Sequence, residues 1–100
     1  MEYKDYDDFM AKYGPVENPS FFDMLAAHLS YYEGIGSLVY KKLIDIELVS
    51  DLYSSLVTSA WDKIESFVLE YRKRNDVPRS GEYMEYLAEQ LQPYRKRIMV

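Results

Sequence analysis

The chain has 100 residues, of which 48% are hydrophobic and 29% charged, with a formal net charge of -5 and no cysteine. This composition predicts one folded domain and excludes a disordered chain, disulfides, thiolate metal sites and cysteine nucleophiles. We expect a cytoplasmic protein without a membrane span, because no apolar run approaches the roughly 18 residues that cross a bilayer and the acidic N-terminus does not resemble a signal peptide.

Residues 1–18 predict a short N-terminal helix followed by a linker. Four apolar residues share one side of the segment 2–13, and Gly14-Pro15 ends it, since proline cannot continue a helix; the four are Tyr6, Phe9, Met10 and Tyr13. Ser20 and Asp23 have the spacing of a capping box, which predicts the start of a second helix at Ser20.

The segment from about residue 20 to residue 42 predicts the central helix of the fold. It carries two neighbouring apolar stripes at helical spacing, and a helix with two such stripes is expected to be covered from two sides. The first stripe is Phe22, Leu25, Leu29, Tyr32, Gly36, Val39 and Leu43, and the second is Phe21, Met24, His28, Tyr31, Ile35 and Leu38. Gly34 and Gly36 lie inside the helix, and the unbroken stripes favour close approach by a neighbouring helix over a break.

Asp45 is a suitable N-cap for a third helix, whose apolar positions continue to about Arg74. The segment 46–74 is compatible with one long helix or with two helices that meet at the polar, β-branched patch Ser54–Ser59, and we favour two. Ser80 begins a last helix that Pro93 interrupts, leaving residues 93–100 as a kinked, basic end. No alternating strand pattern occurs. The sequence therefore predicts an all-α single domain over residues 1–100, a compact bundle of four to five helices around one core.

Residue types that carry catalysis or bind metals are scarce. His28 is the sole histidine, and its neighbours at helical spacing are packing residues, so we expect a core or rim histidine rather than a switch or a ligand. The acidic pairs lie on polar helix faces, where solvated charge is the usual state. We expect no catalytic residue, no cofactor, no metal and no small-molecule substrate, and hence no enzyme.

Positive charge is concentrated near the C-terminus. Residues 1–70 hold 5 basic and 13 acidic side chains, whereas residues 71–100 hold 7 basic and 4 acidic ones. The tetrapeptide Tyr-Arg-Lys-Arg occurs twice, and its arginines are Arg72, Arg74, Arg95 and Arg97. Two such segments could bind nucleic acid or anionic lipid. Basic residues in the last turn of a helix also complement its dipole, and the acidic remainder of the chain makes this second interpretation the favoured one.

Tyrosine is unusually frequent, with 11 copies. Its ring buries a large apolar surface while its hydroxyl stays hydrated, which suits protein interfaces. Tyr31, Tyr32, Tyr53 and Tyr71 lie on apolar stripes and are expected in the core or at its edge, and Trp61 is expected to anchor the core. We expect an exposed contact surface from the remaining candidates, Tyr3, Tyr6, Tyr40, Tyr83 and Tyr86.

A glycine-containing amphipathic helix, then Leu43-Ile44-Asp45, then Trp61 and Tyr71-Arg72, resembles a family of small prokaryotic helical domains of unknown function. The resemblance covers residues 20–91. It implies N-terminal membrane-spanning helices in many members, a pattern from which the acidic N-terminus of this chain departs. The resemblance implies no active-site residues.

These features predict a non-enzymatic interaction domain that binds another protein or self-associates, most simply as a dimer. An acidic body and a basic C-terminal segment would orient such a contact. Binding of nucleic acid or anionic lipid through the repeated basic segments is the alternative hypothesis.

Overall fold

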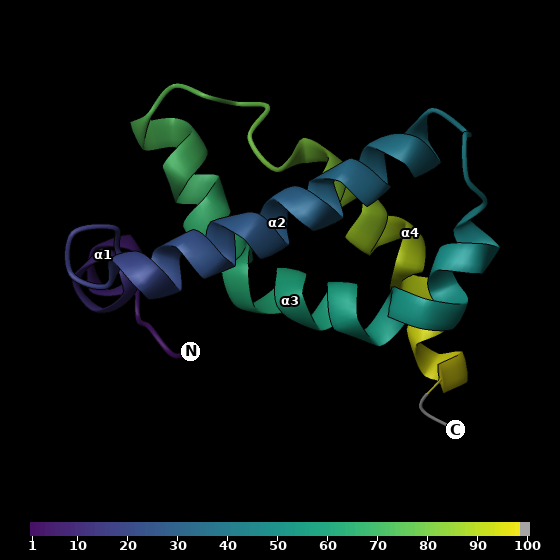
Figure 1. Ribbon diagram of the computed structural model, residues 1–100, viewed down its shortest axis with the longest axis horizontal. Helices are drawn as coiled ribbons and strands as arrows, with labels where there is room; N and C mark the ends of the chain where they lie inside the picture. The colour runs from purple at the N-terminus through teal and green to yellow at the C-terminus, as the bar shows by residue number, and fades with distance from the viewer. Residues whose placement is uncertain (99–100) are drawn as a thin grey trace.

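The computed structural model describes residues 1–98, and the side chains of residues 1–95. Within this part of the chain it contains no strand and four helices: α1 (Tyr6–Tyr13), α2 (Pro19–Tyr40), α3 (Ile46–Arg74) and α4 (Glu82–Ile98). The prediction of an all-α bundle is thereby confirmed (Figure 1).

Short polar residues set the beginnings of α1 and α3. The side chain of Asp5 accepts a hydrogen bond from the backbone N–H of Asp8, and that of Asp45 accepts one from Glu47 at 2.9 Å. Asp45 is therefore the cap that the sequence predicts. The predicted cap at Ser20 is wrong, because α2 begins one residue earlier, at Pro19. The fixed φ of proline suits the first helical position.

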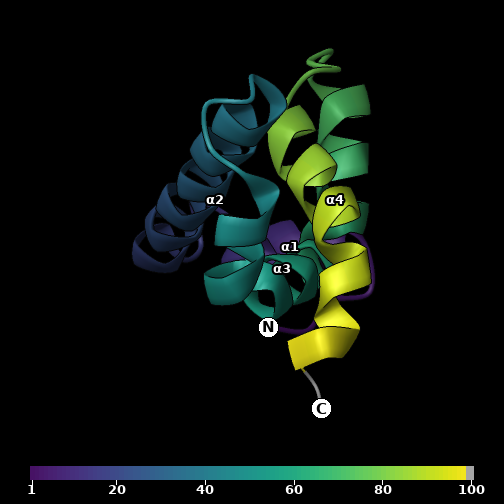
Figure 2. The same ribbon diagram turned by 90° about the vertical axis from the view of Figure 1, so that its right-hand side faces the viewer.

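The central element is α4. This helix packs against both α2 and α3, whereas α2 and α3 are not closely packed against each other. Four of its side chains are at most 2% exposed: Met84, Leu87, Ala88 and Leu91. The prediction that the segment 20–42 is the central helix is wrong. Each long helix packs against α4, and α2 lies on one side of the molecule (Figure 2).

The two apolar stripes of α2 have different surroundings. The first stripe packs into the core through buried Tyr32, Gly36 and Val39. The second stripe, which includes Met24 and Tyr31, is largely exposed. The expected cover on two sides is therefore wrong. The second stripe faces toward α3, but α3 does not approach closely enough to bury it.

A single helix spans 46–74, so the favoured division into two helices is wrong. Figure 1 shows α3 changing direction about midway along its length. In this part of the helix the hydroxyl of Thr58 donates to the carbonyl oxygen of Ser54 at 2.8 Å, a bond that tends to bend helices without ending them. The polar patch Ser54–Ser59 therefore belongs to one bent helix.

Two contacts fix α2 to α4. A Cβ atom added at Gly36 would collide with the backbone carbonyl oxygen of Tyr83, so the absent side chain lets the two helices approach closely. The carboxylate of Glu33 accepts a hydrogen bond from the backbone N–H of Met84 at 2.8 Å, in the first turn of α4. The predicted close approach is confirmed at Gly36 but not at Gly34, where an added Cβ atom would meet no atom of another element within 4 Å.

Candidate functional site

The first of the two Tyr-Arg-Lys-Arg segments serves the fold. Arg72 donates through Nε to the carbonyl oxygen of Ser80 at 2.7 Å, and one of its terminal nitrogens lies 3.2 Å from the Glu85 carboxylate. Arg74 donates to Asp7 at 3.0 Å and to Glu70 at 3.1 Å. The bond to Glu70 is the main cause of a raised pKa for the Arg74 guanidinium. Both arginines therefore join helices or loops of the same chain.

The second segment is similar where its side chains are described. Arg95 donates to the carboxylate of Asp62 on α3 at 2.8 Å. Arg97 lies outside the residues whose side chains the structure describes. The described arginines of both segments are thus paired with acidic groups of the chain itself, and this pairing leaves little positive charge for a phosphate backbone to attract.

The predicted tyrosine surface divides into two separate groups. In the first group, the hydroxyl of Tyr3 donates to the carbonyl oxygen of Lys63 at 2.6 Å, and the ring of Tyr6 stacks on Phe67 with centroids 5.1 Å apart. The guanidinium of Arg74 lies over the Tyr6 ring, 4.4 Å from its centroid. Both tyrosines are half-buried and attach the N-terminal segment to α3.

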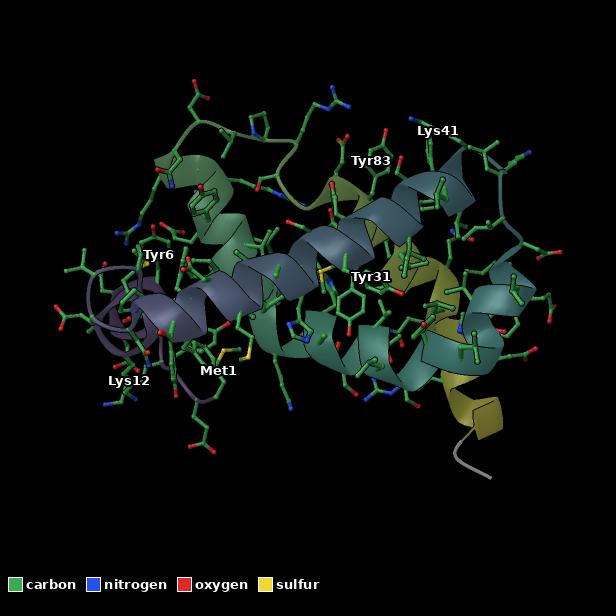
Figure 3. All side chains as sticks on the ribbon, in the orientation of Figure 1. Met1, Tyr6, Lys12, Tyr31, Lys41 and Tyr83 are labelled. Atoms are coloured by element: carbon green, nitrogen blue, oxygen red, sulfur yellow. The ribbon has the colours of Figure 1, made fainter. Side chains whose placement is uncertain are left out.

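In the second group, the ring of Tyr40 contacts the rings of Tyr83 and Tyr86, with centroids 5.5 and 5.3 Å apart. Tyr83 and Tyr86 are half-buried between α2 and α4, and Tyr40 is exposed. Figure 3 shows Tyr6 and Tyr83 far apart on the molecule. The five candidates therefore do not form one continuous surface.

His28 lies in α2 and is exposed, with Nδ1 2.9 Å from the carbonyl oxygen of Met24 in the same helix. It is a rim histidine rather than a core one. Among the described residues, no three acidic or histidine side chains converge in a way that could hold a metal ion. The surface around His28 is apolar instead.

A continuous apolar surface does occur along α2. Met24, Ala27, Tyr31, Gly34 and Leu38 follow one another at alternating steps of three and four residues, so they share one side of the helix. We call these five residues the open stripe. All five are exposed, and the three large side chains, Met24, Tyr31 and Leu38, are 51%, 55% and 41% exposed.

The open stripe lies on a helix with very little charge. In its 22 residues α2 carries two acidic side chains, Asp23 and Glu33, and no basic one, whereas α3 carries nine charged side chains in 29 residues. Glu33 is half-buried and bonded to α4. A solvent-facing helix is usually charged on its outer side. The outer side of α2 between Asp23 and Lys41 has no charged side chain that is exposed.

Beside the open stripe, a groove separates α2 from α3. It holds a hollow of about 310 Å³ whose walls are mainly apolar. A second hollow adjoins it, and the two share His28, Tyr32 and Leu56. Figure 3 shows Tyr31 reaching from α2 toward α3. The groove is thus open to solvent and continuous with the open stripe.

One pair of tyrosines crosses the groove. The hydroxyls of Tyr31 on α2 and Tyr53 on α3 are 3.4 Å apart, and their rings meet edge to face with centroids at 6.4 Å. The hydrogen bond with Tyr53 raises the pKa of Tyr31. Burial raises the pKa of Tyr32, the next residue, which points into the core. Tyr31 was expected in or beside the core, and this prediction is wrong because α3 stays too far away to cover it.

Sequence reasoning treated these apolar residues as internal and so did not find this surface. Two signals were available: the heptad-like spacing of the open stripe and the near absence of charge between residues 24 and 40. Neither signal distinguishes a helix covered within its own domain from one covered by another chain.

A family model described as "Domain of unknown function (DUF4760)" matches residues 3–91. The match includes the open stripe and both walls of the groove, and it extends the resemblance found over residues 20–91 toward the N-terminus. The prokaryotic origin of the family stays a prediction.

No curated protein and no solved structure matches the chain. No helix in the described part of the chain combines the length and the hydrophobicity that a membrane crossing needs.

Proposed function

The chain belongs to the DUF4760 family, a domain of unknown function, and we propose that it is a non-enzymatic protein-interaction module. Its docking surface comprises the open stripe and the adjoining groove between α2 and α3. The partner is another polypeptide that covers this surface with an apolar helix. We place the protein in the cytoplasm, where the absence of cysteine carries no penalty.

The observation that carries this proposal is the combination of exposure with missing charge on α2. Scattered exposed apolar residues are normal on a protein surface. The open stripe is different, because its five exposed residues follow one another at helical spacing and adjoin an apolar groove. The outer side of the helix also has no exposed charged side chain beside them, and this combination is typical of a contact surface. Leu56, on the α3 side of the groove, extends the surface beyond α2.

The surface predicts efficient, site-specific cross-linking in living cells. A photoreactive p-benzoylphenylalanine placed at Leu56 in the full chain would face the groove. We expect ultraviolet light to join this variant to a partner polypeptide, because the bound partner holds a C–H bond near the ketone. The measurement is the appearance of a defined heavier band that carries the chain.

Leu69 provides the matched control, since it lies on the same helix but does not line the groove. Leu56 is 54% exposed and Leu69 is 41% exposed, so both positions accept a large side chain. We expect no defined adduct from Leu69. Equal cross-linking at the two positions, or none from Leu56 in a variant with the circular dichroism spectrum of the wild type, would contradict the proposed docking surface.

A further inference from the structure

We infer that the partner is a second copy of this chain, and that the two α2 helices pair antiparallel along the open stripe. The inference rests on the proposed function, to which it adds the identity of the partner and the direction of the helices.

The open stripe alternates large and small residues. Met24, Tyr31 and Leu38 are large, and Ala27 and Gly34 lie between them. A stripe with this spacing meets a second helix with side chains of one helix fitting between those of the other. The projecting large residues therefore need small residues opposite them, and the stripe itself offers both kinds.

This alternation selects one direction for a symmetric pair. In a parallel pair, each residue of the stripe faces its own copy, so two Tyr31 rings would collide while two Gly34 residues would leave a void. In an antiparallel pair related by a two-fold axis near residue 29, Tyr31 faces the partner's Ala27 and Met24 faces the partner's Gly34. Every such contact is then made twice, as two-fold symmetry requires.

The same axis also gives the longest overlap. Since α2 runs from Pro19 to Tyr40, residue 29 lies at its middle, and two helices crossing there cover each other over nearly their whole length. Figure 1 shows α2 on the broad face of the molecule, whose two longer extents are 38 and 30 Å. A face of this size can supply the roughly 800 Å² per partner that a stable interface buries.

Charge favours a second copy at this face. With a net charge of -5, two copies repel each other when charged surfaces meet, whereas the outer side of α2 brings no exposed charge into the contact between Asp23 and Lys41. In the antiparallel pair the two Asp23 residues would lie about 18 Å apart along the helix axis, at 1.5 Å per residue. That distance exceeds the Debye length of about 8 Å at physiological salt. A parallel pair would place them side by side.

The pairing also gives Gly34 a role. A glycine inside a helix costs about 1 kcal/mol relative to alanine, and no neighbouring atom within 4 Å requires one here. Gly36 faces the opposite situation on the α4 side, where only a glycine allows the close approach. A second α2 helix at Gly34 would repeat this arrangement outside the domain, with the partner's Met24 against the bare backbone.

Light scattering on the full chain tests the pairing. We expect the wild type to be a dimer at micromolar concentration and Gly34→Arg to be a monomer, with its dimer dissociation constant raised about 100-fold or more, because a bulky charge would be buried without a partner. In the monomer the space at Gly34 is open, so the variant should fold. Leu69→Arg, at an exposed position of α3 that does not line the groove, should leave the dimer unchanged. A monomeric wild type, or a Gly34→Arg protein that dimerises as the wild type does, would overturn the inference.

Disulfide trapping tests the relative direction of the two α2 helices. Because the chain contains no cysteine, an introduced cysteine can pair only with another introduced cysteine. A mixture of Ala27→Cys protein with Tyr31→Cys protein, oxidised mildly, should give mainly the mixed dimer. Dimers of Ala27→Cys with itself should be rare in the antiparallel pair and dominant in a parallel one. Predominance of that self-dimer would overturn the antiparallel direction.

The two experiments together separate the inference from the proposed function. A monomeric wild type that still forms Leu56-dependent adducts in cells would refute the second copy and leave the proposed function standing. A monomeric wild type that forms no such adducts would refute both the second copy and the proposed function.

Discussion

The two sides of α2 contain similar residues in different surroundings. Gly36 lies against α4 and Tyr32 is buried in the core, while Gly34 is open to solvent and Tyr31 faces the groove. The difference arises from the neighbouring helices rather than from α2 itself. Because α4 approaches on one side and α3 stays back on the other, equal apolar character leads to burial on only one side.

The comparison separates residues that fold the domain from residues available for contact. On the packed side, removing or adding atoms changes the free energy of unfolding. On the open side, the same changes should leave the isolated domain nearly unaffected and should alter association instead. Pairs of like residues, one from each kind of surroundings, distinguish the two effects when stability is measured at concentrations where the chain is a monomer.

The largest expected difference is between two leucines. Leu87→Ala in α4 should lower the free energy of unfolding by about 2–5 kcal/mol, because it leaves a cavity at a fully buried position. Leu56→Ala in the groove should lower it by less than about 1 kcal/mol, since that side chain stays mostly hydrated in the monomer. Urea denaturation followed by circular dichroism gives both values. Equal losses would mean that the groove is closed in solution.

The two glycines of α2 should respond with opposite signs. Gly36→Ala should destabilise the domain by about 1–3 kcal/mol, because the new Cβ atom meets the Tyr83 carbonyl and forces α2 and α4 apart. Gly34→Ala should stabilise the monomer by about 1 kcal/mol, because alanine favours the helix and nothing obstructs it. Urea midpoints at low protein concentration measure both. A destabilising Gly34→Ala would show that this side of the helix is packed within the domain.

Local signals in the sequence predicted the helices well. Asp45 caps α3 as expected, Trp61 is buried as expected, and the apolar periods gave helices with bounds within two residues of the observed ones for α2 and α3. These features depend on residues a few positions apart, so the chain encodes them locally. The unbroken α3 departs from the prediction because the hydroxyl of Thr58 bonds within the helix and bends it rather than ending it.

The arrangement of the helices could not be predicted in the same way. An apolar stripe indicates that something covers it without indicating what, and so the sequence predicts Tyr31 in the core or at its edge and α2 at the centre of the bundle. The roles of Arg72 and Arg95 depend on Ser80, Glu85 and Asp62 lying nearby, and such proximity comes only from the tertiary fold. For these reasons the candidate surface emerged from the structure rather than from the sequence.

The smallest expected difference concerns two adjacent tyrosines at alkaline pH. The pKa of Tyr32 is raised mainly by burial and that of Tyr31 mainly by its hydrogen bond with Tyr53. Because the pKa of each tyrosine is higher in the folded state, the stability contributed by its neutral hydroxyl is fully present below the unfolded-state pKa, near 10. That stability is lost as the pH rises through the folded-state pKa. The urea midpoint of the wild type should therefore fall between about pH 8 and about pH 10.5.

Each tyrosine-to-phenylalanine variant should reduce this alkaline loss, and Tyr32→Phe should reduce it more. Ionised Tyr32 would place a charge in the core, where little water can solvate it, whereas ionised Tyr31 would be hydrated at the exposed groove. The measurement is the change in urea midpoint between the two pH values for the wild type and both variants. A larger protective effect from Tyr31→Phe would indicate that the bond across the groove, rather than the packed side of α2, limits stability in alkali.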